Sequence, residues 1–375
     1  MNASSAALDL RRAEAAERVR TRGLPHRRIE DWKYTDLRAA LGDGGFDRAS
    51  PVGAIKLPRG VEQYINVGGV VPRWVETYYG KVAPQDFLSD ASLAFDKNFF
   101  AFRVPSGLQV SEPLDFELSG YGQSHVLIVV EAGASVLLKE YIKADGAMNM
   151  GLEIVLDEGA ALRQVWRSAH DEGAVAMANI AVKAAAGAVY RGHYMTTGSK
   201  LSRTEIHIAL EGEGSEAHLS GIGVLGGSAH ADVTTHVEHV AGKTQSTQLF
   251  KNVAGGKSRA VYQGRITVHE GANGSDSRQT AKAILLGGRA EADLKPELLI
   301  FADDVKCAHG AAVGDLDAES LFYLRSRGVS EAEARNLLLR AFLEEAAQEI
   351  EDETLRAEIW LAAEAALPRA MEDAP

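Results

Sequence analysis

Residues 126–159 read VLIVVEAGASVLLKEYIKADGAMNMGLEIVLDEG and contain one full interval of the pattern that decides the fold. The apolar run VLIVV, at 126–130, ends in a glycine-centred turn at Gly133, and the run LEIVL, at 152–156, ends in the same way at Gly159. Short runs of aliphatic and β-branched residues that are bounded by glycine are typical of β-strands. The segment therefore predicts strands that are joined by tight turns.

Glycines that follow such runs recur at a nearly constant spacing. The intervals are 26, 28, 27, 28 and 29 residues, and the glycines are Gly133, Gly159, Gly187, Gly214, Gly242 and Gly271. A period of about 27 residues combined with β-type runs predicts a stacked solenoid, because a single coil cannot bury its own apolar face. We therefore expect a mainly β protein that is built on a β-helix.

Two other architectures share part of this pattern. Leucine-rich repeats have a similar period, but their Leu/Asn consensus is absent from this chain. A large β-sandwich, with hairpins roughly every 8–12 residues, remains an alternative to the β-helix.

The chain divides into three parts that differ in their pattern of helix-favouring and strand-favouring residues. Residues 1–96 are expected to be mostly helical, with helices at 8–22 and within 71–97, and Trp32 and Tyr34 are expected to anchor a small local core there. Residues 97–314 form the predicted β-helix core. Residues 315–375 form a predicted helical C-terminal domain.

The C-terminal part carries clear helix signals. Asp317 is expected to cap a helix that Gly328 ends, and Ser330 with Glu333 forms a capping box for the next helix. A last helix is predicted over 354–367. We expect these helices to cover the exposed strand edges at the ends of the solenoid. The apolar stripe predicted for the second helix consists of Ala334, Leu337, Leu338, Ala341 and Phe342.

The composition limits the classes of partner. Of the 375 residues, 46% are hydrophobic and 25% are charged, which is ordinary for a globular protein. The formal net charge of −12 argues against nucleic acid or an anionic membrane as the main partner. The single cysteine allows no intrachain disulfide, and the N-terminus lacks the apolar centre of a signal peptide. We therefore expect a cytoplasmic protein.

The single cysteine, Cys307, stands two residues before His309. In an extended strand these two side chains point to the same side, where they would offer half of a site for a soft metal or an iron–sulfur species. One thiolate and one imidazole cannot fill a four-ligand cluster site, so the other ligands would come from another chain. The alternative is that Cys307 is a small buried apolar residue.

Other candidate sites are weaker. The fragments Gly242-Lys243-Thr244 and Gly256-Lys257-Ser258 end like phosphate loops but lack the glycine that such a loop requires upstream. Five alternating polar residues are expected to share a solvent-facing strand surface rather than bind a metal, and they are His230, Asp232, Thr234, His236 and Glu238. No order of residues typical of a Ser-His-Asp triad appears, and we expect no enzyme activity in this chain.

Several segments resemble the SufB/SufD family of iron–sulfur cluster assembly proteins, and its SufD branch in particular. The most specific of them is DDVKCAHGAAVG at 303–314, followed by LFYLRSRG at 321–328. EDWKYTDL at 30–37 resembles the N-terminal signature of the family. The segments at 235–268 and 275–288 resemble its central β-helix.

The resemblance implies a right-handed parallel β-helix with helical flanks. It also implies a non-ATPase subunit that pairs with a SufB-like β-helix chain and docks a SufC-like ABC ATPase. A transient iron–sulfur cluster would then be shared between this chain and its partner chain. No tightly bound cofactor is then expected in the isolated chain. His309 and Cys307 match the interface pair of the family. The residues that match its ATPase-docking region are Leu321, Phe322, Leu324, Arg325, Arg327, Leu337, Leu338 and Phe342.

One departure favours the SufD branch over the SufB branch. SufB-type scaffolds carry a further cysteine in the segment that matches 275–287, and this chain has none there. Two other functions remain alternatives: that of a β-helix carbohydrate-active enzyme, and that of a structural protein that pairs with a second copy of itself.

Overall fold

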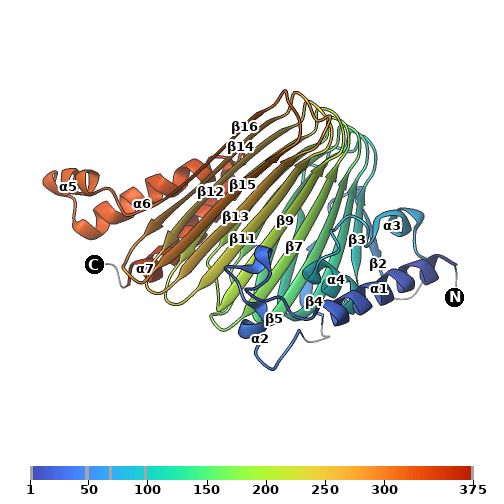
Figure 1. The fold of residues 1–375 in the computed structure, drawn as a ribbon, viewed down its shortest axis with the longest axis horizontal. Coiled ribbons are helices and arrows are strands. Elements are labelled where there is room, and N and C mark those ends of the chain that lie inside the picture. Colours follow the sequence, from blue (N-terminus) through green and yellow to red (C-terminus); the bar gives the residue numbers. More distant parts are fainter. Residues whose placement is uncertain (1–2, 47–49, 67–69, 97–98, 373–375) are drawn as a thin grey trace.

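The computed structural model describes residues 3–46, 50–66, 70–96 and 99–372. Its centre is a parallel β-solenoid of about eight turns, with helices at both ends of the chain (Figure 1). The strands are β1 (Val52–Lys56), β2 (Glu62–Ile65), β3 (Phe100–Val104), β4 (Leu114–Val130), β5 (Ser135–Leu156), β6 (Ala161–Ser168), β7 (Val175–Ala184), β8 (Val189–Thr196), β9 (Leu201–Leu210), β10 (Glu216–Leu225), β11 (His230–His239), β12 (Gln245–Ala254), β13 (Arg259–Val268), β14 (Asp276–Leu285), β15 (Glu291–Ile300) and β16 (Lys306–Gly314).

Each coil contributes one strand to each of two faces. The long strand β5 belongs to both, because residues 135–142 pair with β6 and residues 147–156 pair with β7. Beyond β5, the even-numbered strands follow one another on one face and the odd-numbered strands on the other, always in parallel. We call these the even face and the odd face. The apolar core lies between them and contains residues of both, such as Leu162 and Ile180.

The turns between coils stack in one column. Each residue of the column has a positive φ and donates its N–H to a carbonyl in the next coil. The column consists of Gly107, Gly133, Gly159, Gly187, Gly214, Lys243 and Gly274. The predicted solenoid is confirmed. Two of the glycines in the predicted repeat, Gly242 and Gly271, are not in the column; Lys243 and Gly274 occupy these two positions instead. The two fragments that resemble phosphate-loop ends, 242–244 and 256–258, lie in turns between strands.

The left-handed conformation of Lys243 predicts a stabilising substitution. Lys243→Gly is expected to raise the free energy of unfolding by up to about 1 kcal/mol, because about 1–2 kcal/mol of strain outweighs roughly 0.5–1 kcal/mol of glycine entropy. The exposed ion pair between Lys243 and Glu213 contributes little. Gly214→Ala is the matched control, since no described atom lies within 4 Å of the added Cβ, and it is expected to destabilise. Urea denaturation measures both, and shifts of the same sign would contradict the interpretation.

The N-terminal helices lie on the odd face. They are α1 (Ala3–Arg22), the 3-10 helix η1 (Glu30–Trp32), α2 (Leu37–Leu41), α3 (Arg73–Tyr78) and α4 (Phe87–Phe95). Of these, α4 contacts the first coils and η1 reaches β9, β13 and β15. The turn between α3 and α4 is held by the buried carboxylate of Glu153 on β5. It accepts hydrogen bonds from the backbone N–H groups of Gly80 (2.6 Å), Val82 (2.7 Å) and Ala83 (3.0 Å). The region is predicted to be mostly helical with loops, and the structure adds two strands to it: β1 pairs with β4, and β2 pairs with β3, both in antiparallel fashion. The largely exposed residues of these strands give no alternating pattern to detect.

The segment EDWKYTDL lies across the odd face and does not form a separate core as predicted. The buried Trp32 packs in a cluster with solenoid residues. The guanidinium of Arg203, on β9, lies 4.2 Å from the centre of its ring and donates a 2.7 Å hydrogen bond to the carbonyl of Asp31. Tyr34 is half-buried beside Arg259.

This segment also covers the row of polar side chains on β11 that was predicted to face solvent. Asp232 and Thr234 are buried there, and Thr35 and Arg203 both donate hydrogen bonds to the Asp232 carboxylate. That part of the prediction is wrong: His230 and His236 are half-buried, and only Glu238 in the row is exposed.

The C-terminal helices lie on the even face. They are α5 (Ala318–Ser326), α6 (Glu331–Ala347) and α7 (Glu353–Met371). The predicted caps are confirmed: Asp317 accepts from the N–H of Ser320, and Ser330 accepts from that of Glu333. α7 continues past its predicted end through Pro368. Among the described residues, no helix has the length and apolarity needed to cross a lipid bilayer.

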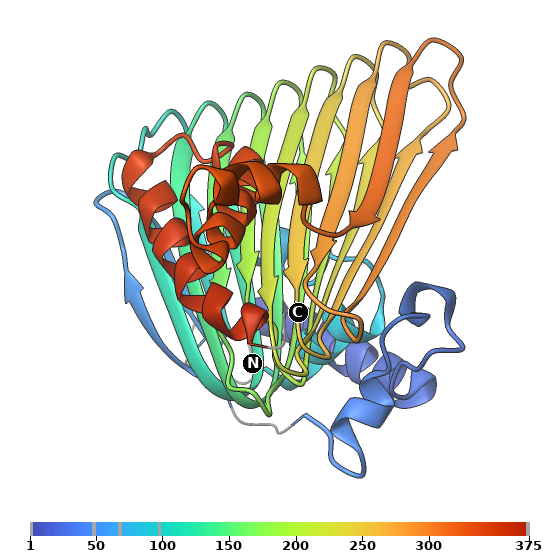
Figure 2. The same ribbon diagram turned by 90° about the vertical axis from the view of Figure 1, so that its left-hand side faces the viewer.

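The expectation that these helices cover the end of the solenoid is wrong. α6 and α7 contact β10 and β12 and leave the last coil uncovered (Figure 2). The buried side of α6 includes Leu339 and Leu343, whereas Leu337 and Ala341 of the predicted stripe are exposed. Apolar residues occur on more than one side of α6, so contact with the sheet decides which of them are buried.

Candidate functional site: the open end of the solenoid

The last coil ends the solenoid with two free strand edges. Within the part of the chain that the structure describes, β15 pairs with β13 alone, and β16 pairs with β14 alone. In Figure 2 the orange strands β15 and β16 lie at one end of the solenoid, away from the red helix α7. Pro296, in the middle of β15, has no N–H to donate and is typical of an edge strand. Large apolar side chains are exposed at this end, and they are Leu299, Ile300, Phe301 and Val313.

Cys307 and His309 both lie on β16, so the structure places them on the terminal strand. In register, Cys307 is opposite Ser277 and His309 is opposite Gln279, both of which are buried inside the solenoid. Because side chains alternate along a strand, Cys307 and His309 share the inward face. With no further coil beyond them, His309 is exposed and Cys307 is half-buried.

The environment of Cys307 keeps its thiol protonated. The side chain packs against a small apolar cluster that includes Ile266, Val268 and Leu298. Burial, and then the negative charge of Asp276, raise the pKa of the Cys307 thiol above its ordinary value of 9.0. A thiolate is the form that ligates metal, so Cys307 becomes a ligand only where a cation or a partner chain offsets this environment.

This environment predicts slow alkylation of Cys307. Iodoacetamide is expected to react with it at pH 7 more slowly than with an unhindered thiol, and the rate should rise with pH beyond the usual thiol range. Asp276→Asn should increase the rate at pH 8, because it removes the neighbouring negative charge. Asp303→Asn is the control. Mass spectrometry follows the reaction, and equal rates for Asp276→Asn and the native chain would contradict the assigned role of Asp276.

The predicted docking residues are not equally available. Phe322 is 74% exposed, Leu337 is 43% exposed, and Arg325 and Arg327 are exposed as well. Leu321, Leu324, Leu338 and Phe342 are half-buried. Phe342 contacts the solenoid, since the ammonium of Lys251 on β12 lies 4.6 Å from its ring centre and donates a 2.7 Å hydrogen bond to its carbonyl.

The open end and α5 are directly connected. Only residues 315–317 separate the end of β16 from the start of α5. α5 itself has no buried residue and contacts α6. A displacement of α5 would therefore act on the strand that carries Cys307 and His309.

Comparison with known proteins identifies the family of this chain. Residues 117–342 match the profile of the domain described as "SUF system FeS cluster assembly, SufBD core domain". The chain belongs to the SufBD family. The family predicted from the sequence is thereby confirmed, and with it an involvement in iron–sulfur cluster assembly.

Several family members are similar to this chain. The iron–sulfur cluster assembly protein SufD of Escherichia coli K12 is 37% identical over 167 residues, which are 44% of this chain and 40% of that protein. A SufBD family protein of Synechocystis is 26% identical over 396 residues, covering 91% of this chain and 87% of the relative. A SufBD family protein of Mycobacterium tuberculosis is 28% identical over 340 residues, covering 86% and 84%.

The Cys-x-His pair of this SufBD family member was predictable from the sequence, but its position at the open end of the solenoid was not. It did not predict that β16 is the last strand or that the end stays uncovered. Pro296 was the available signal, because a proline within a strand indicates an edge. Nothing in the sequence placed Asp276 beside Cys307, since that proximity depends on the pairing of β14 with β16.

Proposed function

We propose that this chain is a SufD-like, non-ATPase subunit of a cytoplasmic iron–sulfur cluster assembly complex. In this proposal residues 97–314 pair with a SufB-like β-solenoid, and residues 315–375 dock a SufC-like ATPase. The observation that carries the proposal is the pair of free strand edges on the last coil, with Cys307 and His309 on its terminal strand β16. Free strand edges favour the addition of strands from another chain.

The cluster in this proposal is cargo that two chains share. Cys307 and His309 supply at most two ligands, so a partner chain supplies the rest. His309 is the more accessible of the two and needs only its neutral imidazole to bind iron. Cys307 adds a soft thiolate ligand or gates access once the partner's charges offset its burial.

The ATPase acts in this proposal through α5. Its exposed apolar residues, Phe322 and Tyr323, offer a docking surface at 74% and 56% exposure. Because residues 315–317 join α5 to β16, movement of docked ATPase subunits would strain the open end and change the accessibility of the Cys-x-His pair.

Two single substitutions test the two interfaces separately. The chain would be co-expressed with a SufB-like and a SufC-like protein, purified anaerobically by a tag on this chain, and assayed for partners, iron and sulfide. Val313→Glu, on the open end, should lose the SufB-like chain, because it buries a charge on pairing. Phe322→Ala, on α5, should lose the SufC-like ATPase and keep the SufB-like chain. Retention of both partners by both variants would refute the assigned surfaces.

A homodimer is the second candidate that these free edges favour. The same strand edges can pair with a second copy of the chain, and light scattering on the isolated protein would detect a dimer. Its dissociation by Val313→Glu would place the contact at the open end. A dimer that persists when the SufB-like chain is present in excess would favour a purely structural role.

A further inference from the structure

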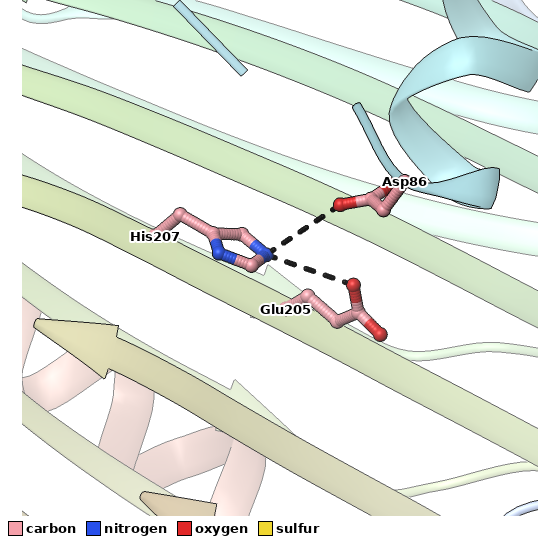
Figure 3. A group of neighbouring side chains, drawn as sticks. All are labelled: Asp86, Glu205 and His207. Carbon is pink, nitrogen blue, oxygen red and sulfur yellow. Dashed lines mark ion pairs between the residues drawn. The ribbon is translucent and has the colours of Figure 1, made fainter. Parts of the chain in front are cut away.

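A second group of metal-ligating side chains lies on the odd face, far along the chain from Cys307. Asp86 caps the N-terminus of α4, while Glu205 and His207 project from β9 (Figure 3). The Nε2 atom of His207 lies 3.7 Å from Asp86 Oδ2 and 3.7 Å from Glu205 Oε2. One ligand atom from each residue lies within 4.8 Å of the others.

Each of these side chains is held in place by a separate contact. Asp86 Oδ1 accepts a 2.8 Å hydrogen bond from the N–H of Ser89. Glu205 Oε1 accepts a 2.7 Å bond from Arg203. The ring of His207 stacks on that of His236 with centroids 4.7 Å apart and planes 6° apart. These contacts leave Asp86 Oδ2, Glu205 Oε2 and His207 Nε2 directed toward one another, as a metal site with fixed outer contacts requires.

Two buried polar atoms at this place have no hydrogen-bond partner among the described residues. One is His207 Nε2, whose 3.7 Å separations from the carboxylates are too long for hydrogen bonds. The other is Oδ1 of Asn179, a side chain that is 1% exposed. The Nδ2 atom of the same carboxamide donates a 3.1 Å bond to Asp86 Oδ2, so Asn179 lies directly at the group. Buried polar atoms are seldom left without a partner, and a ligand on His207 Nε2 would satisfy the first of these two.

The charges at this place do not balance. The fully buried guanidinium of Arg203 pairs with Asp232 and Glu205. Asp86 adds a third carboxylate, so three carboxylates surround one permanent cation and one imidazole. Partly buried carboxylates without matching positive charge are costly, and a divalent cation would supply that charge.

We propose that Asp86, Glu205 and His207 bind a divalent first-row transition ion of the Zn²⁺ type. Zn²⁺ bonds to imidazole nitrogen at about 2.0–2.1 Å and to carboxylate oxygen at about 2.0–2.2 Å, so two ligands of one ion lie at most about 4.3 Å apart. The observed 3.7 Å separations fit this limit. The imidazole favours such an ion over Mg²⁺ or Ca²⁺, which prefer oxygen ligands alone. The ion would tie the start of α4 to β9, and the site is independent of the proposed role of the open end.

Zinc titration of the chelator-treated full chain tests the proposal. Isothermal titration calorimetry is expected to show one Zn²⁺ per chain, and Zn²⁺ should raise the Tm by several degrees, because an ion that binds only the folded state stabilises it. Asp86→Asn keeps the helix cap but removes an anionic ligand, and His207→Phe keeps the ring stack but removes the nitrogen. Each should weaken Zn²⁺ binding at least tenfold and remove the Tm shift. Circular dichroism and the Tm without metal verify that both variants fold.

A Cys307→Ser/His309→Ala double variant separates this site from the open end. It should bind Zn²⁺ as the native chain does, and the zinc absorption edge should show nitrogen and oxygen neighbours without sulfur. Native affinity in folded Asp86→Asn and His207→Phe, or loss of binding only in the double variant, would overturn the assignment. A larger Tm shift with Mg²⁺ than with Zn²⁺ would also overturn it.

Discussion

Replacing His309 with alanine is expected to reduce cluster formation by the reconstituted complex at least tenfold, while all subunits still associate. Loss of an outer contact to a metal ligand already costs about 10–100-fold in metal affinity, so loss of a ligand should cost no less. His309 is exposed on the terminal strand, where its removal creates no cavity in the core. The measurement is the iron and sulfide retained per complex after anaerobic reconstitution, together with the subunit stoichiometry.

The control for this experiment is His218→Ala. His218 is a half-buried histidine on β10 that contacts Glu216 and Thr247, away from the last coil. It should leave cluster formation unchanged. Normal cluster formation by His309→Ala would remove His309 from the proposed ligand set, and loss of the SufB-like chain from that variant would show that His309 acts in pairing instead.

Replacing Glu140 with glutamine is expected to change how the stability depends on pH. The side chain of Glu140, on β5, is buried inside the first coils, where Gln164 donates its one hydrogen bond. Its Oε1 atom has no partner among the described residues. Burial therefore raises the pKa of the Glu140 carboxyl from 4.5 to about 8.

The sign of the effect follows from proton binding. Between pH 4.5 and about 8 the folded chain holds a proton on Glu140 that the unfolded chain has released, so the free energy of unfolding falls as the pH rises through this window. The full pKa difference corresponds to about 4–5 kcal/mol. Glutamine is neutral throughout. The stability of Glu140→Gln relative to the native chain should therefore increase by about 3–4 kcal/mol between pH 5 and pH 8.

Denaturant unfolding at pH 5, 6.5 and 8 measures this difference. Burial lowers the pKa of His170 and of His239 to about 4, which gives a slope of the opposite sign below pH 6.5, but both histidines are present in each protein and cancel in the comparison. Glu117→Gln, on the exposed side of β4, is the control and should not alter the pH profile. A constant difference between Glu140→Gln and the native chain at all three pH values would contradict the assignment.

Local signals in the sequence carried much of the fold. The apolar runs that end in glycine predicted the solenoid, because each coil repeats the same conformational need for a left-handed turn residue. Asp317 and Ser330 marked helix starts correctly, because capping is a contact within one turn of chain. The sequence around Cys307 and His309 pointed to the family. The buried side of α6 could not be inferred locally, since contact with the sheet beneath it decides which residues are buried.

The tertiary structure alone decided which coil is last, what covers each face and which distant groups meet. Glu30 pairs with Lys295 because an N-terminal segment crosses the strands of the odd face. Asp86 meets His207 because α4 packs over β4, β5 and β7, which brings its N-cap residue next to β9, and no sequence period predicts that contact. By itself the sequence determined the repeating coil, the helix caps and the Cys-x-His pair, all of which depend on neighbours within a few residues or on one constant period. The open end and the buried carboxylate–imidazole group depend on packing between segments far apart in the chain, which local patterns do not encode.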